Sequence, residues 1–233
     1  MSPKLHLYGY DICPFSIRIR MLLEVLHLDY SYTNVEVYTQ KPAALLKHSP
    51  MGKVPTLLVD IESLSESSVI ARWLAEVYQE QQLLSRNAWQ KAKQQELMEL
   101  IEQAHGAVST IIRSESEQSF QTGINELSTI LPVLHQELRE EVTHVSTLVD
   151  VWKLVLCSVI RNLDCALNKA LSSAIPQIRN YPNYQKSSVA VAKLVAKVLP
   201  HHYELQLREL LINRAGYCAN LIASEHKVEQ LSA

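Results

Sequence analysis

The chain has 233 residues, with 22 basic and 24 acidic side chains and a formal net charge of −2. This balance, without any run of basic residues, argues against nucleic acid or an anionic membrane surface as a partner. The four cysteines, at positions 13, 157, 165 and 218, form no Cys-x-x-Cys pair and no metal-type spacing. Such cysteine usage is typical of the reducing cytoplasm.

The longest apolar stretches are too short, or too often interrupted by charge, to span a bilayer. The first residues, Met1 to Lys4, lack the apolar core of a signal peptide. With only five glycines and many Leu, Ala, Glu and Gln residues, the chain is expected to be rich in helix. We therefore expect a soluble, cytoplasmic protein.

Cys13 lies at the transition from the first predicted strand, Leu5 to Tyr8, to a predicted helix. Pro14 takes the first helical position, where a missing N–H costs nothing. The Cys13 sulfur is then expected beside free backbone N–H groups and the positive end of the helix dipole, which both favour a thiolate. The alternative is that Cys13 is an inert, buried, small hydrophobic residue.

The next elements complete a compact α/β unit. Alternation over 30–37 predicts a second strand, and a short helix is expected over 41–47. Pro55 opens an apolar strand over 55–59, either as a strand-start residue or after a cis Val54–Pro55 bond, and 61–64 completes a hairpin. A helix running to Val77 follows, with Ser67 as its expected N-cap. The order βαβ-α-ββα predicts one domain over residues 1–78.

Composition changes at Gln79, and we expect a linker over 79–88 and an all-α domain over 89–233. Apolar spacing predicts helices around 97–108, 120–134 and 151–160, with further helices over 162–173, 182–198 and 200–213. Thr147 and Asp150 have the spacing of a capping box. The predicted fold class is therefore α/β plus all-α, ending in a helical bundle.

Four short patterns occur together in this chain: Cys13-Pro14-Phe15-Ser16, Val54-Pro55, Glu66-Ser67 and Thr147-Leu148-Val149-Asp150. In this order and approximate spacing they resemble the glutathione transferase superfamily. The cysteine makes the chain most similar to its cysteine-type members: omega-class transferases, dehydroascorbate reductases and two-domain glutaredoxins. The likeness is dense over 4–78 and thin over 89–233. It implies a thioredoxin-like N-terminal domain followed by a helical C-terminal domain.

The resemblance also implies roles for individual residues. Cys13 matches the nucleophile, and Val54 matches the residue whose backbone pairs with the cysteinyl part of glutathione. Pro55 matches the family's cis-proline. Glu66 and Ser67 match the pair that binds the γ-glutamyl end, as a carboxylate and a helix N-terminus are suited to do.

Two further candidates are Lys41, in the stretch Gln40-Lys41-Pro42, and Phe15. The resemblance assigns Lys41 to the glycyl carboxylate of glutathione, although a solvated surface lysine is the ordinary alternative. Phe15 is expected near the sulfur or in the core. Ser16 stands where dithiol glutaredoxins have a second cysteine, which excludes a dithiol mechanism through this motif.

The function implied is glutathione-dependent thiol transfer through a Cys13 mixed disulfide, as deglutathionylation or dehydroascorbate reduction. Glutathione would be the co-substrate and a small or protein disulfide the other partner. No metal is expected, because the nine histidines form no ligand pattern. The alternative is a binding or regulatory protein of the same fold, as in stringent-starvation and chloride intracellular channel proteins. Dimers are common in the superfamily, so a homodimer is an expectation without an interface signature here.

Overall fold

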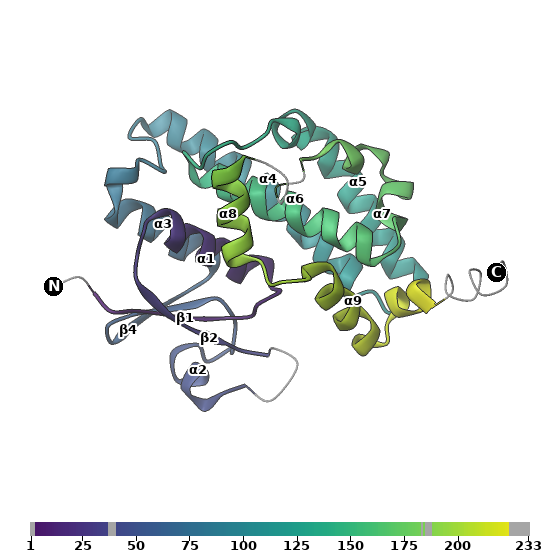
Figure 1. Cartoon of the computed structure of the whole chain (residues 1–233), viewed down its shortest axis with the longest axis horizontal. Coiled ribbons are helices and arrows are strands. Elements are labelled where there is room, and N and C mark those ends of the chain that lie inside the picture. The colour runs from purple at the N-terminus through teal and green to yellow at the C-terminus, as the bar shows by residue number, and fades with distance from the viewer. Residues whose placement is uncertain (1–2, 37–40, 183, 185–187, 224–233) are drawn as a thin grey trace.

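The computed structural model describes residues 3–36, 41–182, 184 and 188–223. An α/β region comes first along the chain and a helical region follows. In Figure 1 the sheet lies at the lower left, and the helical region extends above it and to the right. Both regions share one continuous hydrophobic core. The predicted fold class, α/β followed by all-α, is confirmed.

A mixed four-stranded sheet organises the first region, in the order β2-β1-β3-β4. β1 (Leu5–Gly9) pairs parallel with β2 (Tyr30–Asn34) and antiparallel with β3 (Thr56–Val59), and β4 (Glu62–Ser65) completes the hairpin. A parallel pair needs a crossover, which α1 (Pro14–Val25) supplies. The predicted strands are therefore all present.

Helices cover both faces of this sheet. Alternate strand residues point to opposite faces, so Leu7 and Leu57 join the main core with α1 and α3 (Ser67–Val77). Tyr8 joins a smaller cluster with Leu45 of α2 (Ala43–His48) on the other face. Figure 1 accordingly shows α2 below the sheet, opposite α1 and α3.

The second region consists of helices and short 3-10 turns over the residues described. In chain order these are η1 (Gln79–Gln81), α4 (Ala88–Ile112), α5 (Glu117–Arg139), α6 (Leu148–Ala166), α7 (Ala170–Ala174), η2 (Pro176–Asn180), α8 (Val189–Val198) and α9 (Tyr203–Arg214). Residues 217–223 are also helical. No helix among the described residues is both long enough and apolar enough to cross a membrane.

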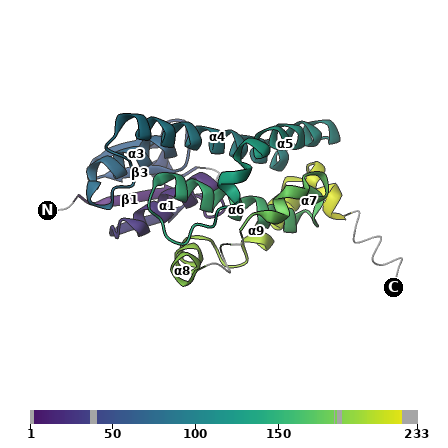
Figure 2. The same ribbon diagram turned by 90° about the horizontal axis from the view of Figure 1, so that it is seen from above.

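The central helix of the second region is α6. Between Leu148 and Ile160 only Asp150 is not buried. α6 contacts α1, α4 and α9, and Figure 2 shows it between α4–α5 on one side and α8 on the other. The Thr147 hydroxyl accepts from the Asp150 N–H at 3.2 Å and the carboxylate of Asp150 accepts from the Thr147 N–H at 2.8 Å, so the predicted capping box is confirmed.

Several predicted boundaries were wrong by a few residues. β2 ends at Asn34, while Val37 lies outside the described residues. The N-cap of α3 is Glu66 rather than Ser67, because Glu66 takes a left-handed φ of 68° and Ser67 is already helical. The helix predicted over 162–173 is the end of α6 plus α7, separated by Asn168 and Lys169 at positive φ. In the stretch predicted over 182–198, α8 begins only at Val189, and residues 183 and 185–187 lie outside the description.

Candidate functional site

The turn between β1 and α1 holds Cys13 at the helix N-cap, with Pro14 in the first turn, as predicted. The Cys13 N–H donates to the Tyr10 carbonyl at 3.0 Å. The Tyr10 N–H donates to the Ser16 hydroxyl at 3.0 Å. Gly9 makes room for this turn, because a Cβ there would lie 2.8 Å from the Tyr32 ring and 3.1 Å from Ser16 Cβ. The backbone around the sulfur is therefore tightly packed.

Strand β2 anchors the same turn through Asp11. The Asp11 N–H donates to the side chain of Asn34 at 3.0 Å, and the Asp11 carboxylate accepts from the Tyr32 hydroxyl at 2.8 Å. The Arg20 guanidinium lies 3.5 Å from that carboxylate and stacks on the Tyr32 ring. These contacts fix the turn to β2 and, through Arg20, to α1.

The electrostatic setting of Cys13 combines opposing effects. Burial of the sulfur raises the pKa of the Cys13 thiol above its ordinary value. Hydrogen bonds from the Ser16 backbone and hydroxyl and from the Phe15 backbone, with the charge of Arg18, lower that pKa but do not offset burial. The predicted stabilisation of a thiolate at the helix start is thus present, but burial outweighs it in the unliganded protein.

A second backbone segment runs from Gly52 to Thr56 beside the cysteine. Its Val54–Pro55 peptide bond is cis, which was one of the two alternatives that the sequence left open for Pro55. The Thr56 hydroxyl donates to the Lys53 carbonyl at 2.9 Å, which ties the segment together. Both Val54 and Pro55 line the cavity in front of Cys13.

Lys41 lies against this segment at Gly52. A Cβ on Gly52, whose φ is +59°, would lie 2.3 Å from Lys41 Cδ. The Lys41 ammonium donates to the Met51 carbonyl at 3.3 Å, and the side chain lines the cavity. Its predicted neighbour Gln40 lies outside the described residues.

The start of α3 forms the third part of the site. Ser67 and Ser68 line the cavity in the first turn, where backbone N–H groups have no intrahelical partner. The Glu66 carboxylate pairs with the Lys53 ammonium at 2.8 Å, and both side chains are exposed. The buried Ser67 hydroxyl accepts from Arg18 at 3.4 Å. An anion is favoured at this helix N-terminus.

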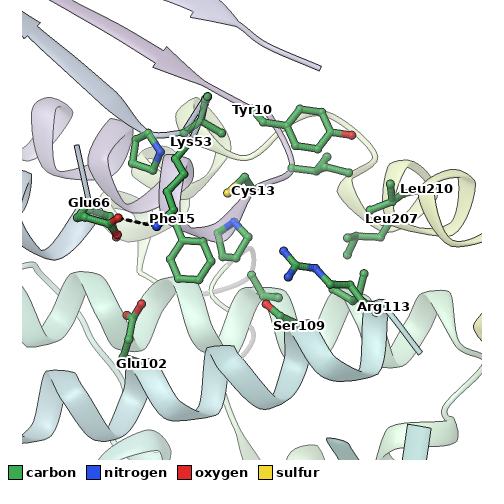
Figure 3. Close-up of a pocket in the computed structure, with 18 of the residues that line it drawn as sticks. Tyr10, Cys13, Phe15, Lys53, Glu66, Glu102, Ser109, Arg113, Leu207 and Leu210 are labelled. Carbon is green, nitrogen blue, oxygen red and sulfur yellow. Dashed lines mark hydrogen bonds and ion pairs between the residues drawn. The ribbon is translucent and has the colours of Figure 1, made fainter. Parts of the chain in front are cut away.

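All the site residues predicted from the sequence line one cavity of about 420 Å³. These are Cys13, Phe15, Lys41, Val54, Pro55, Glu66 and Ser67. Figure 3 shows the Cys13 sulfur near Phe15, with the Glu66–Lys53 pair to one side. Phe15 is partly buried and lies against the Arg18 guanidinium and the His105 ring.

The helical region supplies a wall of the cavity that sequence reasoning missed. Its contributions come from α4 and the turn after it, from α6 and from α9: Glu102, Ser109, Ile112, Arg113, Val159, Tyr203, Leu207 and Leu210. Helical spacing predicted the helices but not which faces meet the cysteine. No local pattern joins residues this far apart in the chain.

Arg18 links the two regions beneath the cavity. Its side chain is fully buried, its guanidinium carbon lies 4.2 Å from the Trp152 ring centroid, and it pairs with Glu102 at 2.5 Å. A second guanidinium nitrogen lies 3.3 Å from His105 Nδ1. Burial lowers the pKa of Arg18, and Glu102 raises it in turn. A buried arginine needs such partners, so this contact fixes α1 against α4 and α6.

α9 reaches the cysteine turn directly. The Tyr203 hydroxyl donates to the Ile12 carbonyl at 3.1 Å, and Tyr203 is buried. This bond positions the apolar face of α9 over the cavity. No group of three His, Cys, Asp or Glu residues suited to a metal ion occurs in the described part of the chain.

Comparison with known proteins identifies this arrangement. Residues 7–82 match the family model of the glutathione S-transferase N-terminal domain. The α/β region of this chain is thus similar in sequence to the N-terminal domain of the glutathione transferase superfamily. The resemblance read from the short sequence patterns is thereby confirmed at the level of the superfamily.

Curated relatives come from several transferase classes. The chain is 36% identical to a zeta-class glutathione S-transferase of Euphorbia esula over 93 residues, covering 39% of this chain and 41% of that one. It is 27% identical to the rat omega-1 glutathione S-transferase over 124 residues, covering 53% and 51%. The matched part thus spans about half the length of these relatives.

Similarity in structure extends over nearly the whole chain. A rice glutathione transferase, solved in complex with glutathione, aligns with a TM-score of 0.72, covering 93% of this chain and 99% of that one. At 19% identity this likeness concerns the fold alone. It includes the helical region, which the family model does not reach.

Proposed function

We propose that this protein is a glutathione-dependent thiol transferase that works through a mixed disulfide on Cys13. The observation that carries the proposal is the position of the Cys13 sulfur, at a helix start inside a cavity lined by Val54, Pro55, Glu66 and Ser67. A thiol placed there reacts with a disulfide by exchange. A hydroxyl-type transferase would instead present Tyr or Ser at this point.

Glutathione fits the cavity as co-substrate. Its γ-glutamyl carboxylate suits the first turn of α3 at Ser67 and Ser68, and its ammonium suits the Glu66 carboxylate. The exposed backbone at Val54, before the cis-proline, suits pairing with the cysteinyl part. Lys41 suits the glycyl carboxylate. Rice and bacterial transferases of similar fold were solved with glutathione bound, which supports the assignment.

In the first step, the Cys13 thiolate attacks the glutathionyl sulfur of a mixed disulfide. A bond forms between Cys13 and glutathione, and the other thiol leaves with the electron pair. The thiolate of a second glutathione then attacks the glutathionyl sulfur, releasing oxidised glutathione and restoring Cys13. Ser16 leaves no neighbouring thiol in this motif to resolve the intermediate, which is why glutathione must do so.

The test is glutathione-dependent reduction of a small glutathione mixed disulfide by wild type and Cys13→Ser. We expect the substitution to reduce turnover to background while glutathione binding is retained. Cys165→Ser is the matched control, because Cys165 is the other partly exposed cysteine within the described residues and lies outside the cavity. Background rates in the wild type would contradict the proposal.

The raised pKa of Cys13 supports a second candidate, a glutathione-binding protein without rapid turnover. A protonated thiol is a poor nucleophile. In that case the same assay gives background rates in both proteins, while calorimetry still detects glutathione binding. A stoichiometric protein partner recovered from native extract would then define its role.

A further inference from the structure

Cys13 divides the cavity into two ends of different character. Figure 3 shows Glu66 and Lys53 on one side of the sulfur and Arg113, Leu207 and Leu210 on the other. The first end belongs to the α/β region and carries the groups suited to glutathione. The second end belongs to the turn after α4 and to α9. A disulfide that meets Cys13 with glutathione at the first end must extend its other half into the second.

The charged side chains at the first end of the cavity all have a partner within the described part of the protein, whereas the one at the second end does not. Lys53 pairs with Glu66 at 2.8 Å, and Glu102 pairs with Arg18 at 2.5 Å. The Lys41 ammonium donates to the Met51 carbonyl. Within residues 3–36, 41–182, 184 and 188–223, the Arg113 guanidinium has neither a hydrogen bond nor an ion pair.

The position of Arg113 follows from the helix that precedes it. It is the C-cap of α4, where the negative end of the helix dipole favours a cation. Figure 3 shows its guanidinium directed into the cavity below Cys13 rather than away from it. Ile112, Leu207 and Leu210 form apolar surface around it. A planar guanidinium is suited to bidentate binding of a carboxylate.

We infer that this second end selects disulfide substrates whose non-glutathione half joins an apolar chain to a carboxylate. The apolar chain would contact Leu207 and Leu210, and the carboxylate would bind Arg113. This inference rests on the proposed function, because it places glutathione at the first end. It adds a substrate class that the thiol chemistry alone does not specify.

The exchange step itself is the same for either kind of substrate. When Cys13 bonds to the glutathionyl sulfur, the old sulfur–sulfur bond breaks and its electron pair stays on the departing thiol. That thiolate then takes a proton from water. The net exchange is one disulfide and one thiolate for another disulfide and another thiolate, with no further oxidant or reductant.

The experiment measures binding of two unreactive thioethers of equal length, S-hexylglutathione and S-(5-carboxypentyl)glutathione, to the full chain by calorimetry. We expect the wild type to bind the acid about fivefold more tightly, as a partly exposed ion pair supports. Arg113→Gln should lower this ratio to about one. High salt should also lower the ratio in the wild type.

The matched control is Arg139→Gln, which removes an exposed arginine from the last turn of α5, away from the cavity. Its ratio should equal that of the wild type. An equal affinity for both ligands in the wild type, or an unchanged ratio in Arg113→Gln, would overturn the inference. Binding of S-hexylglutathione would in that case still support the glutathione site. Absence of binding by either thioether would refute the glutathione site itself, and the inference with it.

Turnover provides a second readout. Mixed disulfides of glutathione with 6-mercaptohexanoic acid and with hexanethiol differ only in the terminal carboxylate. Arg113→Gln should lower the ratio of their kcat/KM values about fivefold, whereas Arg139→Gln should not. A uniform loss for both substrates would instead indicate a general effect of Arg113 on the fold and would contradict selectivity.

Discussion

The two regions of this protein build their halves of the cavity by different means. In the α/β region the site is made largely from backbone: a helix N-cap at Cys13, a cis peptide at Val54–Pro55 and the first turn of α3. In the helical region it is made from side chains of separate helices, such as Arg113 and Leu207. Backbone geometry requires particular residues next to one another, but a wall of helix side chains does not.

This difference indicates how each region responds to substitutions. A change in the α/β region disturbs a turn whose dihedral angles are fixed, so its cost is steric and local. A change on the helical wall alters what the cavity binds and leaves the turn in place. The contact between Arg18 and Trp152 joins the regions, and a change there affects both.

The largest effect is expected when this contact between the two regions is removed by Trp152→Ala. Trp152 is only 1% exposed, and removing it deletes the ring on which Arg18 stacks. We expect a loss of about 4 kcal/mol in the free energy of unfolding, measured by urea denaturation. Trp89→Ala is the matched control, because Trp89 is 75% exposed and should change stability by less than about 0.5 kcal/mol. Similar losses of unfolding free energy in both variants would contradict a special role for the contact between Arg18 and Trp152.

The two regions should respond in opposite directions to the same glycine substitution. Gly9→Ala places a Cβ 2.8 Å from the Tyr32 ring, so we expect a loss of about 2 kcal/mol in unfolding free energy. Gly106→Ala, within α4, meets no atom within 4 Å and should stabilise the protein by about 0.5–1 kcal/mol. Thermal unfolding of the two variants checks both signs. A stabilised Gly9→Ala protein would show that the cysteine turn is looser than described.

A smaller effect concerns the pH dependence of Cys13. Because burial raises the pKa of its thiol, the thiolate forms at higher pH in the folded chain than in an unfolded one. Alkylation by iodoacetamide, followed on the Cys13 peptide by mass spectrometry, should be half-maximal above the ordinary value of about 8.5. The same peptide in urea-unfolded protein is the control and should show the ordinary value. A lower midpoint in the folded protein would mean that the helix start outweighs burial.

Much of the α/β region could be predicted because the local sequence of this region indicates its backbone conformation. Pro14 after a strand indicates a helix start, and alternation of apolar residues indicates strands. One error occurs where a neighbouring residue took over a local role. Ser67 has the side chain of an N-cap, but Glu66, at a positive φ of 68°, takes the N-cap position, so α3 begins one residue earlier.

The helical wall and the buried arginine could not be predicted for a physical reason. Arg18 has the sequence environment of an exposed charge, and only the meeting of α1, α4 and α6 provides Glu102, His105 and Trp152 as partners. Likewise, Cys13 was expected to gain from the helix start, and the burial that opposes this gain comes from elements distant in sequence. Tertiary packing decides both cases.

The hydrogen bond from Tyr203 to Ile12 also has a consequence for the order of events during translation. A chain leaves the ribosome from its N-terminus at roughly 5–20 residues per second. The strands and helices around Cys13 are therefore complete on the order of ten seconds before Tyr203 has been synthesised. During that interval the nascent chain carries its thiol without α9 over it. We expect the nascent thiol to be more open to oxidants and to glutathione than the thiol of the finished protein.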